Sequence, residues 1–131
     1  MITIKNLGFT YGKKDASEGY VLRNINMKLE EGRIYGLLGE NGVGKTTLLT
    51  LLCGLKKPKK GSIDAEGHDP YERKPELLAE QFYLSDECAS VNMKAIEYAR
   101  NYGRFWPGFE IERFIEIMSV FETDPEMKMN R

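Results

Sequence analysis

Apolar and polar residues alternate along much of the first part of the chain, which predicts β-strands with one buried face. The alternation covers residues 1–10 and 21–29, and a further strand is expected over 62–65. Two further apolar runs, 33–38 and 82–84, lack the alternation and are typical of strands that are buried on both faces. We therefore expect the first part of the chain to be built around β-structure.

A helical period replaces the alternation in the last third of the chain. Apolar residues recur on one side of a first helix after residue 92, and a clearer amphipathic helix follows. These positions are Met93, Ile96, Ala99 and Tyr102 in the first helix and Ile111, Phe114, Ile115, Met118 and Phe121 in the second. Pro107 and Gly108 break the pattern between them. We favour a helical pair that buries its shared seam over the alternative, a ligand pocket lined by these aromatic residues and methionines.

The composition is that of an ordinary globular domain, and it argues against some functions. The 131 residues are 41% hydrophobic and 30% charged, and 19 basic and 20 acidic side chains leave a formal net charge of −1. This balance argues against a protein that mainly coats nucleic acid or an anionic membrane. We therefore interpret the basic run 56–60 as a solvated loop and expect no nucleic-acid partner.

The cysteine, histidine and apolar content indicates a cytosolic protein. Cys53 and Cys88 are too few for a disulfide framework, and the single histidine, His68, cannot complete a zinc site of the usual kind. The N-terminus has no signal-peptide pattern. The longest apolar-rich stretch, 48–55, falls short of the ~20 residues needed to span a bilayer. We expect any membrane role to be peripheral.

The clearest chemical signal is the glycine-rich segment 39–46, which has the form G-x-x-x-x-G-K-[ST]. A buried strand is expected before it, and a helix over 46–53, closed by Gly54, is expected after it. Another short helix is expected over 75–80. The alternative to a phosphate-binding loop is a strand–helix turn with an incidental lysine, and the context on both sides disfavours it. We therefore expect a nucleoside triphosphate with Mg²⁺ as the ligand.

Each residue type in this segment suits a polyphosphate. Glycines 39, 42 and 44 allow a positive φ and bring backbone N–H groups close to phosphate, while the start of the helix adds the positive end of its dipole. Lys45 supplies a mobile charge for the β- and γ-phosphates, and the Thr46 hydroxyl can ligate Mg²⁺. Thr47 offers a further hydroxyl within reach of the α-phosphate.

Four stretches resemble the ATPase domain of ATP-binding-cassette (ABC) transporters, in that family's order and spacing. They are 7–12, 21–27, 36–49 and 54–63. In the first, Tyr11 stands at the position of the family's adenine-stacking aromatic residue, and the third is similar to the family's form of the phosphate loop. The nucleotide contacts that follow from the resemblance are Tyr11, Gly39, Asn41, Gly42, Gly44, Lys45, Thr46 and Thr47.

The resemblance implies an α/β fold with a P-loop NTPase core. An antiparallel β subdomain and the P-loop core are expected over about 1–88, and the start of the ABC helical subdomain over about 89–131. The strand before Gly39 is expected in a mainly parallel core sheet.

The chain departs from the family at two places. Asp86 stands where the family has a glutamine whose amide oxygen serves Mg²⁺ or its water. A carboxylate oxygen can also serve the metal, so Asp86 joins Thr46 as an expected metal contact, with a solvated loop aspartate as the alternative. An acidic residue here, together with 105–109, resembles a subset of bacterial exporter-type ABC ATPases.

The second departure is that the sequence stops at Arg131, about where the signature motif of the family is expected. No segment matches that motif, the metal-binding aspartate, the catalytic glutamate or the switch histidine. The sequence is therefore expected to be the N-terminal part of an ATPase domain, which binds ATP but hardly hydrolyses it.

For the parent protein, the resemblance implies the ATP-binding subunit of an ABC transporter, an ATPase that couples ATP binding and hydrolysis to transport. Its implied partners are a transmembrane permease subunit and a second ABC ATPase domain, at the cytoplasmic, inner face of the cell membrane. The alternatives are a non-catalytic nucleotide-binding module, another P-loop enzyme such as a small-molecule kinase, and a soluble ABC protein of translation or repair. Tyr11, upstream of the phosphate loop, argues against the kinase.

Overall fold

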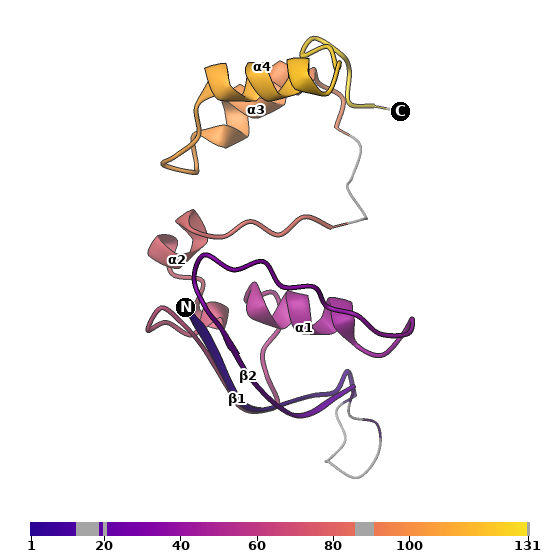
Figure 1. Ribbon diagram of the computed structural model, residues 1–131, viewed down its shortest axis with the longest axis vertical. Coiled ribbons are helices and arrows are strands. Elements are labelled where there is room, and N and C mark those ends of the chain that lie inside the picture. Colours follow the sequence, from indigo (N-terminus) through magenta and orange to yellow (C-terminus); the bar gives the residue numbers. More distant parts are fainter. Residues whose placement is uncertain (13–18, 20, 86–90, 131) are drawn as a thin grey trace. The chain divides into compact units, whose positions relative to one another are not determined.

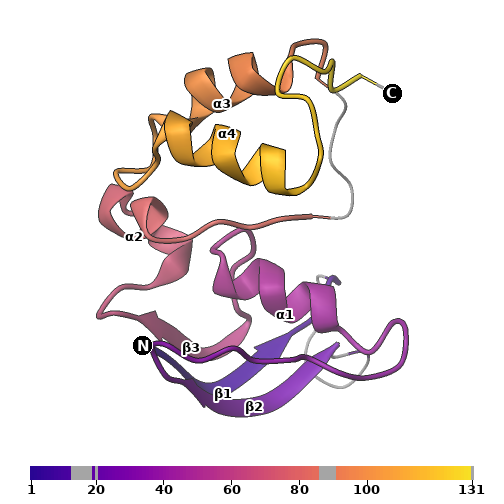
Figure 2. The same cartoon turned by 45° about the horizontal axis from the view of Figure 1, so that its top comes forward.

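The computed structural model describes residues 1–12, 19, 21–85 and 91–130, which belong to two compact units, Met1–Phe82 and Tyr83–Arg131 (Figures 1 and 2). The first unit contains β1 (Ile2–Phe9), β2 (Leu22–Leu29), α1 (Lys45–Leu52), β3 (Lys60–Ala65), the 3₁₀ helix η1 (Pro70–Glu72) and α2 (Pro75–Ala79). The second contains α3 (Ala95–Gly103) and α4 (Ile111–Val120). The expected mixed α/β class is confirmed, and so is the expected antiparallel β-structure.

The sheet of the first unit has the strand order β2-β1-β3, with antiparallel pairing on both sides of β1. A bulge in β1 places Ile4 and Leu7 in the same core, although strict alternation would send residues three apart to opposite faces. Asn6 within the bulge has a φ of 49°, and its backbone N–H donates to Asn26 Oδ1 at 2.9 Å. The Asn26 side chain thus satisfies a donor that the interrupted ladder leaves free.

Helix α1 lies against one face of this sheet and closes the core (Figure 2). Leu48 and Leu51, three residues apart on α1, are both buried. The buried cluster comprises Ile4, Leu7, Phe9, Leu22, Leu48, Leu51 and Ile63. This packing fixes the start of α1, and with it the end of the glycine-rich segment, relative to the sheet.

The two segments predicted as strands buried on both faces differ from that prediction. Residues 33–38 and 82–84 form no strand, and Ile34 and Leu38 are 102% and 93% exposed. Phe82 and Leu84 are also exposed. A parallel core strand is stable only beside a hydrogen-bonded neighbouring strand, and the sheet of the described residues contains only β2, β1 and β3. The expected mainly parallel sheet is therefore not present in the described part of the chain.

The second unit is the predicted helical pair, broken between its helices as Pro107 and Gly108 indicated. Ile96 and Ala99 of α3 are buried, whereas α4 has no buried residue. Phe114 is half-buried, and Ile115, which was expected in the buried seam, is exposed because α4 is covered on one side only. The segment after α4 returns to the start of α3, where the Ile96 N–H donates to the Pro125 carbonyl. Lys94 and Glu126 form an ion pair of 2.7 Å there.

Candidate functional site

The phosphate loop, residues 39–46, connects an extended exposed segment to α1. Gly42 and Gly44 have φ values of 84° and 99°, in the left-handed region that only glycine adopts at little cost. Gly44 is the N-cap of α1. A Cβ on Gly44 would lie 2.9 Å from Val21 Cγ1, so the absent side chain also allows the loop to lie close to the start of β2. The loop thus presents the N-terminus of α1 with its unpaired backbone N–H groups, which suits an anion.

Lys45 is held by the loop in which it stands. Its Nζ donates to the carbonyls of Gly39 and Glu40, each at 2.8 Å. An ammonium has three N–H donors, so one remains for an anion with respect to the described residues. These two contacts keep a positive charge at the loop, where an approaching polyphosphate would meet it.

The two threonines of the first turn of α1 have different surroundings. Thr46 is exposed, so its hydroxyl is open to solvent. Thr47 is only 5% exposed, and its hydroxyl shares a hydrogen bond of 2.8 Å with the hydroxyl of Tyr11. The structure therefore joins the predicted adenine-stacking residue directly to the predicted phosphate-binding helix.

Tyr11 has further contacts through its ring. The Phe9 and Tyr11 rings meet edge to face with centroids 5.1 Å apart, and Lys56 Nζ lies 5.1 Å from the Tyr11 ring centroid. Even so, 64% of the Tyr11 surface is exposed. The tyrosine is thus oriented by neighbours and still accessible to a planar ligand.

Lys56 is the residue of this site that the sequence interpretation missed. The run 56–60 was expected to be a solvated loop, but Lys56 contacts the Tyr11 ring, and the Lys59 N–H donates to the Gly8 carbonyl. Only the return of the chain after α1 brings the run beside β1, so its residue pattern carried no signal of this contact.

The other predicted site residues are placed as follows. Asn41 is exposed in the phosphate loop. Asp86 lies outside the described residues. In the described part of the chain, no group of three or more His, Cys, Asp or Glu residues could hold a metal ion. Of the two predicted metal contacts, Thr46 and Asp86, the structure describes the position of Thr46.

Cys53 ends α1 but brings no nucleophilic chemistry to the site. It is a free thiol, and burial raises its pKa above that of an ordinary cysteine. A raised pKa keeps the thiol protonated near neutral pH, and the protonated form is the unreactive one.

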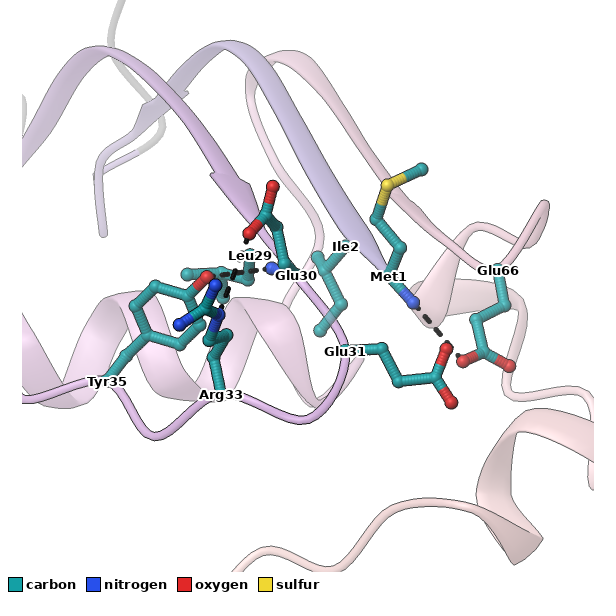
Figure 3. Close-up of a pocket in the computed structure, with 8 residues that line it drawn as sticks. All are labelled: Met1, Ile2, Leu29, Glu30, Glu31, Arg33, Tyr35 and Glu66. Atoms are coloured by element: carbon teal, nitrogen blue, oxygen red, sulfur yellow. Dashed lines mark hydrogen bonds and ion pairs between the residues drawn. The ribbon is translucent and has the colours of Figure 1, made fainter.

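A separate pocket of about 300 Å³ lies at the other end of β1 (Figure 3). It is lined by Met1, Ile2, Leu29, Glu30, Glu31, Arg33, Tyr35 and Glu66. Three of these residues are carboxylates, against one guanidinium and the amino group of Met1, so the pocket is unfavourable for a polyphosphate. At about 3.3 Å per residue, β1 separates it from Tyr11 by roughly 25 Å.

The glycine turns, the lysine after them and the helix that follows are the features of a P-loop protein. The family model described as ABC transporter matches residues 22–127. The chain therefore belongs to the ABC transporter family.

Individual relatives agree with this membership. A protein of Methanosarcina acetivorans, named as an ABC transporter ATP-binding protein, is 32% identical over 130 residues, which is 96% of this chain and 46% of the relative. The chain thus spans about half the length of this curated relative.

Solved structures show the same fold. An ABC transporter ATP-binding protein from Pyrococcus furiosus superposes with a TM-score of 0.77 at 24% identity, covering 98% of this chain and 60% of that one. A dimeric ATP-binding cassette bound to ADP and Pi superposes with a TM-score of 0.73 at 21% identity, covering all of this chain and 61% of that one. The expected P-loop fold of ABC ATPases is confirmed.

Proposed function

We propose that this chain binds ATP with Mg²⁺ at the phosphate loop and Tyr11, as part of the ATP-binding subunit of an ABC transporter. The observation that carries the proposal is the loop itself, with Gly42 and Gly44 at positive φ and Lys45 held on two loop carbonyls ahead of α1. Family membership supports it, because the relatives are named as ATP-binding proteins.

Each residue of the proposed site has a separate part in binding. The N–H groups of 39–46 and the Lys45 ammonium hold the β- and γ-phosphates, and Asn41 stands in the same loop. Tyr11 stacks on the adenine, for which its exposed ring is suited. Thr47 faces the α-phosphate. The proposed site thus contacts the ligand at both its base and its phosphates.

The proposed site also fits Mg²⁺. This ion prefers oxygen ligands and usually keeps several waters while binding phosphate oxygens. The exposed Thr46 hydroxyl, next to Lys45, offers such an oxygen without displacing any packing. Asp86 is proposed as the second protein oxygen. When bound, the ion neutralises charge on the phosphates, and Thr46 keeps it beside the loop.

At the level of the whole transporter, we propose that ATP binding and hydrolysis drive transport through a transmembrane permease subunit. A second ABC ATPase domain is the other proposed partner. The solved ATP-binding cassette bound to ADP and Pi supports this proposal, because that cassette is dimeric. We place the subunit at the cytoplasmic face of the cell membrane. None of the described helices is long and apolar enough to cross a bilayer. Helices α3 and α4 are proposed to belong to the helical subdomain that docks on the permease.

The substitution Lys45→Ala tests the nucleotide site. It removes a charge-assisted contact of about 1.5–3 kcal/mol, which corresponds to a Kd for Mg-ATP roughly 10- to 150-fold higher. Isothermal titration calorimetry on both proteins measures the change. The matched control is Lys28→Ala, which removes the same charge from an exposed position on β2 and should leave Kd nearly unchanged. Equal affinity of Lys45→Ala and the unaltered chain would refute the site.

A further inference from the structure

The hydroxyl pair of Tyr11 and Thr47 is the strongest link between the two halves of the proposed nucleotide site. The residues are 36 positions apart, yet their oxygens lie 2.8 Å from each other in a partly buried setting. Thr47 sits in the first turn of α1, and Tyr11 follows the end of β1. The contact therefore connects the sheet to the helix that carries the phosphate loop.

The chemistry of a phosphate fixes the direction of this hydrogen bond once a ligand is present. Ionised phosphate oxygens accept hydrogen bonds and donate none, and the Thr47 hydroxyl has a single proton to donate. If Thr47 donates that proton to a phosphate, then only Tyr11 can supply the proton between the two hydroxyls. The resulting chain runs from the Tyr11 O–H to Thr47 Oγ1 and from the Thr47 O–H to the phosphate. Each bond in such a chain polarises the next.

Resting on the nucleotide site proposed above, we propose that Tyr11 is a positioning residue for the polyphosphate as well as a platform for the base. Its hydroxyl turns the Thr47 proton toward the phosphates of a nucleoside triphosphate. Tyr11 thus acts on both ends of one ligand: its ring stacks on the base, and its hydroxyl orients the Thr47 hydroxyl toward the phosphates.

The surroundings of the pair explain why the tyrosine is needed. A threonine in a helix otherwise directs its hydroxyl to a carbonyl three or four residues earlier, away from a ligand. Thr50 does this, because its Oγ1 donates to the Thr47 carbonyl at 2.9 Å. The Tyr11 hydroxyl competes with that arrangement at Thr47. The edge-to-face contact with Phe9 holds the phenol where it can do so.

The substitution Tyr11→Phe separates the two roles, because it keeps the ring and removes the hydroxyl. The ligands are Mg-ATP and inorganic tripolyphosphate with Mg²⁺, measured by calorimetry, and adenosine, measured by saturation-transfer NMR. Loss of one hydrogen bond predicts a Kd for tripolyphosphate and for ATP about 3- to 10-fold higher, with adenosine binding unchanged. The control is Tyr35→Phe, which removes a phenol hydroxyl that accepts from the Glu30 N–H at the remote pocket.

A double-mutant cycle identifies the partner. In a Thr47→Val background Tyr11→Phe should have no further effect on tripolyphosphate, whereas in a Thr47→Ser background, which keeps a hydroxyl, the loss should persist. Unchanged tripolyphosphate affinity of Tyr11→Phe, in a chain that binds ATP, overturns the positioning role and leaves the nucleotide site intact. Failure of the unaltered chain to bind either ATP or tripolyphosphate refutes the proposed function itself, and this inference with it.

Discussion

Lys45 and Tyr11 show that single residues of this site are already oriented by the protein. Two carbonyls of the phosphate loop accept from the Lys45 ammonium. Tyr11 is in contact with Phe9 through its ring and with Thr47 through its hydroxyl. A side chain that is already ordered loses less conformational entropy when a ligand arrives, so these contacts favour binding before any ligand contact is formed.

Lys56 is expected to act against adenine stacking. Its ammonium lies over the Tyr11 ring, and a base that stacks there must displace it, at a cost of about 0.5–1 kcal/mol for an exposed cation–π contact. Lys56→Met should therefore lower the Kd for Mg-ATP by about 2- to 5-fold relative to Lys57→Met.

Lys57 is a matched control because it is the next residue and has the same charge, but its Nζ lies over the ring of Tyr71. Calorimetric titration of both variants cancels the general effect of removing one positive charge near a polyphosphate. The same Kd for the two variants would show that Lys56 does not compete with the base. In a Tyr11→Ala background the difference should vanish.

At the scale of elements, α1 is fixed at both ends by glycine. Gly44 begins it in a left-handed conformation, and Gly54, with a φ of 67°, ends it. The Gly54 N–H donates to the Leu51 carbonyl and the Leu55 N–H donates to the Thr50 carbonyl, which is the Schellman arrangement. The helix is thus stopped where the chain must turn toward β3, and the expected role of Gly54 is confirmed.

Gly54→Ala is expected to destabilise the first unit. A Cβ at this position would overlap the Pro70 carbonyl, which is backbone and cannot move aside, and the left-handed conformation adds strain. We expect a loss of about 2–4 kcal/mol in the free energy of unfolding. Urea denaturation followed by far-UV circular dichroism measures it.

The control for Gly54 is Gly36→Ala, because a Cβ on Gly36 would meet nothing within 4 Å and Gly36 has no positive φ. That variant should change the free energy of unfolding by no more than about 0.5 kcal/mol. Equal denaturation midpoints for the two variants would contradict the close approach of α1 and η1.

At the scale of the whole molecule, the described residues contain the proposed nucleotide site, but the apolar segment before it lies in no sheet. The segment 33–38 leads straight into the phosphate loop, and Ile34 and Leu38 are almost fully exposed. Unpaired backbone beside exposed apolar side chains is a template for pairing with another strand. The phosphate loop is therefore followed by the packed helix α1 and preceded by a segment that lies in no sheet.

We expect these 131 residues to bind Mg-ATP with turnover near the uncatalysed background. Phosphoryl transfer to water needs a group that positions and deprotonates the water, and no residue of this sequence matches the family's catalytic glutamate or signature motif. A phosphate-release assay measures the rate of ATP hydrolysis, with the longer Methanosarcina acetivorans relative as the comparison protein. Mg²⁺-dependent release that Lys45→Ala abolishes would show that the 131 residues contain a complete catalytic site.

The sequence by itself determined the strands of the described sheet, the helical pair and the glycine turns of the phosphate loop. Alternation identified β1 and β2, and the helical period identified α3 and α4, because both signals depend only on neighbouring residues. The strand expected over 62–65 corresponds to β3. The segment 39–46 defined a phosphate loop through residue types alone, and its glycines have the positive φ that was expected.

Only the tertiary structure decided which residues meet around that loop. The contacts of Tyr11 with Thr47 and Lys56 join positions 36 and 45 apart in the chain, which no local pattern encodes. It also decided that 33–38 and 82–84 are not strands here. An apolar run specifies that a segment can be buried, but a strand forms only when another strand supplies its hydrogen bonds, and no strand of the described residues lies beside these segments in a sheet.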